Sequence, residues 1–259
     1  VTEYIDKNIT PGVLYEYQVV ALSKGSTGTD EMSFYGFGYI LTGLNIKEND
    51  IQGDVLLLID TTLKDNLKSE ILRLKEDLRA EGWGIIEKYV LRTEKFNGKE
   101  VKKIKSIILD EYNNNKNLKS IFILGRVAVP YSGNMNPDGH PDHIGAWPSD
   151  FYYGYTIDEG FWTDNKINST TASREENKNI PGDGKFDNST QSIGSATLSV
   201  GRVDFYGMNI FEEKNGKSEL DLLRNYLDKD HNYRNGEFEY INSGIIDDNF
   251  SASSYIEAF

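Results

Sequence analysis

The chain has 259 residues, of which 38% are hydrophobic, enough for one large globular domain or two modest ones. Its 41 acidic residues outnumber 28 lysines and arginines, and the formal charge of -13 disfavours nucleic acid as a partner. No apolar stretch is long enough to cross a bilayer, and the lack of cysteine excludes disulfides, thiolate metal sites and a cysteine nucleophile within this sequence.

Asparagine, aspartate, glycine, serine, threonine and tyrosine are abundant, a composition typical of secreted or cell-surface proteins of bacterial type. The opening Val1-Thr2-Glu3 has neither an initiator methionine nor a leader, and the closing residues 254–259 resemble the start of a helix. We therefore expect the chain to be an excised segment of a longer protein.

Residues 1–46 predict two β-strands. Apolar and polar residues alternate from Leu14 to Ala21 after a Pro11-Gly12 turn, and a second strand is expected from Phe34 to Leu44. Two strands alone do not make a stable module. The Pro-Gly turn before Tyr15 resembles the penultimate strand of a fibronectin type III sandwich with its corner tyrosine. The alternative is an ordinary hairpin packed on the next domain.

Residues 47–259 predict an α/β domain in which buried strands alternate with amphipathic helices. The apolar run from Asp54 to Asp60 is typical of a strand buried on both faces. We expect an open, mainly parallel sheet with helices on both faces. The first elements are a strand at 54–60, a helix at 63–81, a strand at 83–91, a helix at 101–112 and a strand at 120–125.

A long stretch from Ala128 to Thr197 shows no periodicity and is rich in glycine, proline, asparagine and aromatic residues. A stretch of this length is seldom a mere connection and usually carries function. The regular pattern then resumes with a strand at 197–203, a helix at 218–233 and a strand at 240–246.

Charged or hydroxyl-bearing residues follow several predicted strands, where ligands collect in open parallel sheets. We expect these residues to face one crevice, unless each one caps a helix or lies solvated at the rim. They are Asp60, Thr61, Arg126, Arg202, Asp204, Asp247 and Asp248. No glycine-rich phosphate loop and no Gly-x-Ser-x-Gly elbow are present, which disfavours nucleotide binding and a serine hydrolase.

Two of the three histidines, His140 and His143, lie with Asp142 in the stretch from Asn136 to Asp150. Imidazole and carboxylate groups this close could bind a transition metal, orient a catalytic partner, or simply order the loop by hydrogen bonds. Two histidines are fewer ligands than a zinc site needs, so the pattern is a weak signal.

The turn Pro181-Gly182-Asp183-Gly184-Lys185-Phe186-Asp187 places carboxylates with glycine between them, a spacing that suits calcium. It lacks the glutamate that closes an EF-hand loop. Asp183 and Asp187 are therefore candidate ligands with Asp164 or backbone carbonyls, and a plain Gly-Asp turn is the alternative.

Three ordered motifs resemble the gingipain family of secreted cysteine peptidases, which have a caspase-like fold. They are the strand Ile121–Gly125, the segment Pro148-Ser149-Asp150-Phe151-Tyr152-Tyr153-Gly154, and the strand Val200-Gly201-Arg202-Val203 before a long helix. The resemblance covers residues 54–247 and is more specific for the fold than for activity.

The resemblance implies that this chain is the N-terminal portion of an endopeptidase whose catalytic histidine and cysteine come later. The portion would be inactive alone, and protein or peptide substrates would bind through the missing half. Asp150, in the Ser-Asp-x-x-Tyr-Gly match, would orient the histidine or line the substrate pocket, and Asp142 is a second candidate.

Two further hypotheses belong to other classes. One is a non-catalytic, calcium-stabilised adhesion or scaffold domain of a cell-surface protein. The other is a phosphate-binding receiver-like domain, suggested by acids at strand ends such as Asp60. The long aromatic stretch has no place in so compact a fold, which ranks this hypothesis last.

Overall fold

The computed structural model describes residues 5–10, 13, 15–27, 30–42, 51–136, 139–157, 160–167, 170–188 and 196–237. The chain divides into two compact units. The first comprises Val1–Gln52 with Glu81–Trp83, and the second comprises Gly53–Ala80 with Gly84–Phe259.

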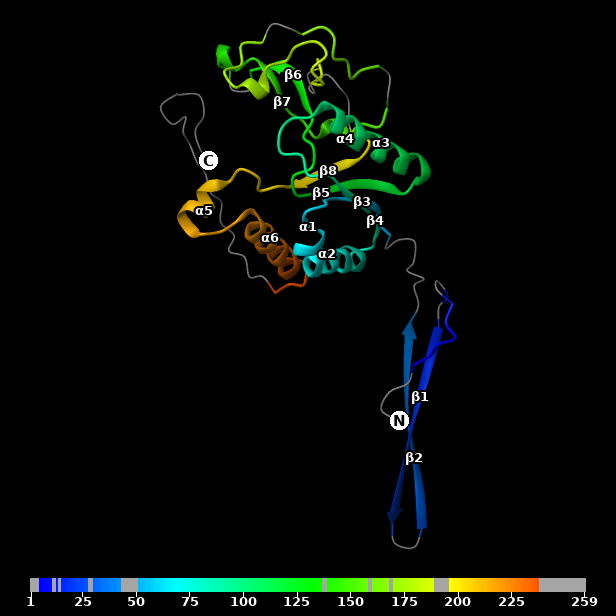
Figure 1. Ribbon diagram of the computed structural model, residues 1–259. Helices are drawn as coiled ribbons and strands as arrows, with labels where there is room; N and C mark the ends of the chain where they lie inside the picture. Colours follow the sequence, from blue (N-terminus) through cyan, green and yellow to red (C-terminus); the bar gives the residue numbers. More distant parts are fainter. Residues whose placement is uncertain are drawn as a thin grey trace, which may run out of the picture. The chain divides into compact units, whose positions relative to one another are not determined.

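The first unit contains an antiparallel hairpin of β1 (Tyr15–Thr27) and β2 (Asp30–Thr42), drawn in blue in Figure 1. Both predicted strands are present and longer than expected, because backbone pairing continues through Gly25, Ser26 and Thr27. These small side chains carry no apolar alternation that could signal a strand. Within the described residues no third strand joins the hairpin, so a surrounding β-sandwich stays a prediction.

The second unit is built on a four-stranded parallel sheet, as the alternating pattern predicts. Its strands stand in the order β4-β3-β5-β8, in which β3 pairs with β5, and β5 with β8. At the carboxyl ends, Thr61 N donates to Val90 O at 2.9 Å and Gly125 N donates to Val203 O at 2.8 Å. The strand bounds are β3 Gly53–Asp60, β4 Trp83–Val90, β5 Leu118–Leu124 and β8 Ser199–Val203.

Strand β3 is buried on both faces because its side chains are apolar from Val55 to Ile59. Leu56 and Leu58 belong to a core cluster that includes Ile104 and Ile108 of the neighbouring helix. The alternating side chains, such as Leu57, point to the opposite face and are also fully buried. A sheet with two apolar faces requires helices on both sides.

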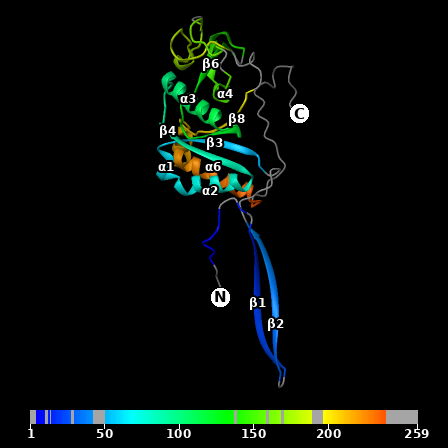
Figure 2. The ribbon, with the colours of Figure 1, turned by 90° about the vertical axis from the view of Figure 1, so that its right-hand side faces the viewer.

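Helices cover both faces of the sheet, as predicted, and Figures 1 and 2 show the three layers. Helices α2 (Lys68–Ala80) and α6 (Glu219–Arg234) pack together on one face. Helix α3 (Gly98–Asn114) covers the other face and contacts the short helix α4 (Phe151–Gly154).

Local signals explain where these helices begin. The side chain of Asn97 accepts hydrogen bonds from the first amides of α3, and Ser218 forms a capping box with Asp221 at the start of α6. Helix α3 follows the loop after β4, and α6 begins well beyond the end of β8 at Val203. The first residue of α6, Glu219, still lies at the carboxyl edge of the sheet, because its carboxylate accepts hydrogen bonds from Arg92 just after β4.

The helix predicted from Leu63 to Glu81 is two helices, α1 (Leu63–Asn66) and α2. Leu67 separates them: its φ of -124° leaves the helical region, and its side chain is fully buried. Helix α5 (Asn209–Asn215) was not predicted, because its two turns carry no buried residue and therefore no apolar stripe. The strand expected at 240–246 lies outside the described residues.

Within the stretch from 128 to 197, which we call the excursion, the described residues follow the carboxyl end of β5 and pack over the α3 side of the sheet (Figure 1). Lys105 of α3 anchors it by donating to the carbonyls of Tyr152, Tyr153 and Tyr155. An aromatic cluster of Tyr152, Trp162 and Phe186 fills its interior. Its elements are β6 (Tyr131–Met135), the 3-10 helix η2 (Pro141–His143), β7 (Gly145–Pro148), α4, and the 3-10 helix η3 (Glu175–Asn177).

Candidate functional site

The carboxyl edge of the sheet gathers charged side chains from several strands. In the order β4-β3-β5-β8, the connections leave in opposite directions from the neighbours β3 and β5, and the crevice outside such a reversal is where doubly wound sheets bind ligands. Gly125 lies there with φ of +85°, and a Cβ atom at this position would come within 2.8 Å of the Cβ atom of Asp60. The two strand tips are therefore in close contact.

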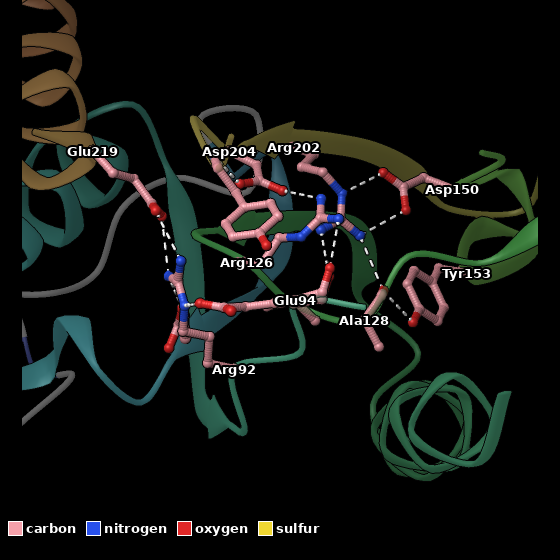
Figure 3. Close-up of polar contacts among 12 residues, drawn as sticks. Arg92, Glu94, Arg126, Ala128, Asp150, Tyr153, Arg202, Asp204 and Glu219 are labelled. Carbon is pink, nitrogen blue, oxygen red and sulfur yellow. Dashed lines mark hydrogen bonds and ion pairs between the residues drawn. The ribbon is translucent and has the colours of Figure 1, made fainter. Parts of the chain in front are cut away.

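Arg92, just after β4, holds three carboxylates at this edge (Figure 3). Its guanidinium donates to Asp60 at 3.0 Å, to Glu94 at 2.9 Å, and to both oxygens of Glu219 at 3.0 and 2.8 Å. These hydrogen bonds, with Glu219 first, raise the pKa of Arg92 above its usual range although burial opposes them. Asp60 is fully buried and also accepts from the amide and hydroxyl of Thr62.

Arg126, after β5, fills the rest of the crevice. It donates to the carboxylate of Asp204 at 2.9 Å and to the carbonyl of Glu94 at 3.1 Å. The ring of Tyr206 lies 4.6 Å from the guanidinium carbon of Arg126 and 5.4 Å from that of Arg92, within the range of a cation–π contact. The crevice between β3 and β5 is thus occupied by the protein's own ion pairs.

Arg202 of β8 forms a second cluster, also drawn in Figure 3. Its guanidinium binds both carboxylate oxygens of Asp150 at 2.7 and 2.8 Å, and it donates to the carbonyls of Val127 and Ala128. Tyr153 donates its hydroxyl to the same Ala128 carbonyl at 2.7 Å. Burial alone would lower the pKa of Arg202, but the hydrogen bonds and charge of Asp150 raise it above its usual value.

A pocket of about 320 Å³ opens beside the first cluster. Its wall contains the exposed ring of Tyr206 and the thioether of Met208. Glu212 and Lys217 also line it, and neither side chain has a hydrogen-bond or ion-pair partner within the described residues. An acid, a base and an apolar wall are suited to holding a polar ligand of modest size.

The rule that strand ends collect ligands predicted four members of these clusters, namely Asp60, Arg126, Arg202 and Asp204, whereas Asp150 was singled out through its motif. It also applies to Arg92, which follows β4 closely but was not predicted. Glu219 and Tyr206 were missed because they lie at the start of a helix and in a turn, where no strand pattern draws attention to them. Asp247 and Asp248 lie outside the described residues.

The structure places Asp142, His140 and His143 in the excursion, around η2, and not in the Arg202 cluster. The two imidazole rings are 5.3 Å apart between centroids, and His143 Nε2 is 3.9 Å from a carboxylate oxygen of Asp142. Ser173 donates its hydroxyl to Asp142. No hydrogen bond or ion pair joins Asp142 to Asp150 within the described residues.

Two of the three acids predicted to bind calcium, Asp164 and Asp187, tie two loop segments together. Asp164 accepts hydrogen bonds from the amides of Gly182 and Gly184 at 2.8 and 2.7 Å. Asp183 accepts from the amides of Ile180 and Lys185, and therefore stays within its own turn.

Asp187 accepts from Thr163 and from the amides of residues 165–167. Burial raises the pKa of Asp187, but the backbone amides of Asn165 and Ile167 outweigh it, so the net shift is downward. Among the described residues, no three histidine, aspartate or glutamate side chains form a group arranged for a metal ion. Calcium binding stays a prediction, and a cation would share oxygens that already accept amide hydrogens.

No helix among the described residues has the length and apolar character of a membrane span. No protein-family model matches the sequence, and neither the curated proteins nor the solved structures contain a significant match.

Proposed function

We propose that this chain forms the supporting α/β portion of a secreted or cell-surface, gingipain-like cysteine endopeptidase that cleaves proteins or peptides. The sequence contains no cysteine, so under this proposal the nucleophile is supplied from outside these 259 residues. The order β4-β3-β5-β8 of a parallel sheet is compatible with such a fold.

One observation carries the proposal: two of the three motifs that resemble the family meet at a single guanidinium, which also binds the segment following the third motif. Arg202 comes from the Val-Gly-Arg-Val strand, and Asp150 comes from the Ser-Asp-x-x-Tyr-Gly segment. The remaining acceptors, the carbonyls of Val127 and Ala128, lie shortly after Gly125, the last residue of the first motif. Residues far apart in the sequence are thus held in one partly buried polar cluster, which gives the motif residues a shared physical role.

This arrangement favours a positioning role for Asp150 over direct contact with substrate. Both of its carboxylate oxygens are engaged by Arg202, and its side chain is only 26% exposed. A carboxylate that orients a catalytic histidine or receives a basic substrate side chain needs an oxygen facing that group. Asp150 would therefore act by fixing the position of Arg202 in β8. Asp142, in contrast, has a 66% exposed side chain that could contact a substrate directly.

The proposal is tested by a peptidase assay on the full-length gene product with fluorogenic peptide amides of varied side chains. We expect hydrolysis that iodoacetamide abolishes, and none by the 259-residue chain alone. Metal chelation and serine-directed inhibitors serve as controls for other mechanisms. Hydrolysis that survives alkylation, or hydrolysis by the chain alone, would contradict the proposal.

A second candidate is a non-catalytic, calcium-stabilised adhesion or scaffold domain. The observation in its favour is that the crevice between β3 and β5 is occupied by the Arg92 and Arg126 ion pairs rather than open to a ligand. This candidate predicts no hydrolysis by the full-length product and a melting temperature that rises with calcium.

We also propose that β1 and β2 are the last strands of a fibronectin type III-like module. The hydroxyl of Tyr15 accepts a hydrogen bond from the amide of Thr10 at 2.8 Å, the geometry of a tyrosine corner. Hydrogen exchange provides a test, since the Thr10 amide should be protected in the wild type and lose protection in Tyr15→Phe. Equal exchange in both proteins would remove this support.

A further inference from the structure

A separate pocket of about 310 Å³ lies in the excursion, away from the carboxyl-edge clusters. It is formed between the segment 139–148, which contains η2 and β7, and the segment 170–177, which contains η3. His143, Trp147, Ser173, Arg174 and Asn177 line it. Its volume is near the lower limit for sites of small organic ligands.

The walls of this pocket are fixed by hydrogen bonds between the two segments. The hydroxyl of Thr170 donates to the carbonyl of Ile144 at 2.6 Å, and the buried amide of Asn177 donates to the carbonyl of Ala146 at 2.7 Å. At Gly145 the segments are so close that a Cβ atom would lie 2.2 Å from the carbonyl oxygen of Asn177. A site held this firmly loses little conformational freedom on binding.

Trp147 supplies a fixed aromatic wall. Its indole Nε1 donates to the carbonyl of Met135 at 3.1 Å and to that of His143 at 3.3 Å, which sets the orientation of the ring. The indole nitrogen is therefore used inside the protein. The side chain therefore contributes apolar ring surface to the pocket, and the flat face of another ring can stack against it.

Arg174 supplies the charge. Arg174 is exposed, and its guanidinium has no hydrogen-bond or ion-pair partner within the described residues. The neighbouring acid Glu175 is bound to Lys178, and Asp142 accepts from Ser173. A planar guanidinium presents paired N–H donors that match a carboxylate.

We propose that this pocket binds a small carboxylic acid built on a ring, with the ring against Trp147 and the carboxylate on Arg174. Sugar acids and aromatic acids share this chemistry. The inference does not depend on the peptidase proposal, because no residue of the Arg92 or Arg202 cluster lines the pocket. The overall charge of -13 opposes an anion, so a dissociation constant on the order of 1 mM is expected for a ligand this small.

The experiment is a two-dimensional ¹H–¹⁵N titration that follows the indole N–H resonance of Trp147, assigned with Trp147→Phe. Sodium glucuronate and sodium benzoate are the two acid probes, with methyl glucoside and benzamide as neutral counterparts of similar shape. We expect at least one acid to shift the resonance saturably, and its neutral counterpart to bind about tenfold more weakly or worse. Which acid binds distinguishes the sugar source from the aromatic one.

Arg174→Met should weaken the acid about tenfold, and Arg174→Lys should restore part of the affinity. The matched control is Arg79→Met, which removes another exposed arginine, in α2, and should leave the affinity unchanged. Because both arginines are exposed, the variants are expected to fold. No saturable shift with either acid, equal binding of a neutral counterpart, or unchanged affinity in Arg174→Met would overturn the inference.

Discussion

Replacing Asp150 with asparagine tests the Arg202 cluster most sharply. The substitution keeps the size of the side chain but removes its charge and one of its two acceptors for the guanidinium. Arg202, whose side chain is 14% exposed, is then left with the carbonyls of Val127 and Ala128 and one amide oxygen. We therefore expect a loss of unfolding free energy, because the largely buried positive charge of Arg202 no longer has its counterion.

The magnitude follows from the burial of the pair. Removing one partner of a fully buried ion pair costs about 3–5 kcal/mol of unfolding free energy. Because 26% of the Asp150 side chain remains exposed, solvent screening reduces the expected loss to about 2–3 kcal/mol. The assay is urea unfolding of the chain, followed by circular dichroism, in which the midpoint should fall and the slope should stay the same.

A double-mutant cycle separates the pair from other effects. Arg202→Met alone should also be destabilising, and the double variant should lose less than the sum of the two by about 1–3 kcal/mol. Glu175→Gln, which breaks the exposed pair with Lys178, is the control and should leave the unfolding midpoint unchanged. If Asp150→Asn unfolds at the wild-type midpoint, or the two substitutions are additive, Arg202 and Asp150 do not stabilise the cluster as argued.

Three further predictions concern the crevice and the excursion. Arg92→Met should cost about 3 kcal/mol in the same urea experiment, because it leaves Asp60 buried without its cation, and an unchanged midpoint would contradict that role. Asp187→Asn should be destabilising at neutral pH, because the pKa of Asp187 is lower in the folded protein than in the unfolded chain. The ionised carboxylate therefore stabilises the fold above about pH 4, and this stabilisation disappears as the pH falls through the folded-state pKa. Its stability difference from the wild type should therefore narrow in acid, and a constant difference from pH 7 to pH 2 would refute this. Calcium should raise the melting temperature relative to a chelator if Asp164, Asp183 and Asp187 bind it, and equal melting temperatures would remove the calcium prediction.

The parallel sheet was predictable because each buried strand is marked by the residues of one short segment of the sequence. A strand buried on both faces must be apolar at nearly every position, and the run from Val55 to Ile59 has no other plausible environment. The helix start at Ser218 was equally predictable, because its capping box joins Ser218 to Asp221, only three residues further along the chain. The break between α1 and α2 at Leu67 could not be predicted in this way, because it depends on where the folded core has space for the leucine side chain.

The composition of the site was only partly predictable, because its contacts join residues that the sequence separates widely. Arg92 and Glu219 are 127 positions apart, and neither is unusual in its own segment. Asp150 was identified through its motif, but its engagement by Arg202 could be seen only once β8 and α4 were side by side. Sequence therefore predicted which edge of the sheet is polar, whereas the pairing of charges required the fold.

The most direct measurement for the central claim is mass spectrometry of the full-length gene product after reaction with a peptidyl cysteine-directed inhibitor. If this chain is the supporting portion of a cysteine endopeptidase, one adduct should form on a cysteine outside these 259 residues as hydrolysis is lost. Hydrolysis that continues without an adduct, or an adduct within these residues, would contradict the account.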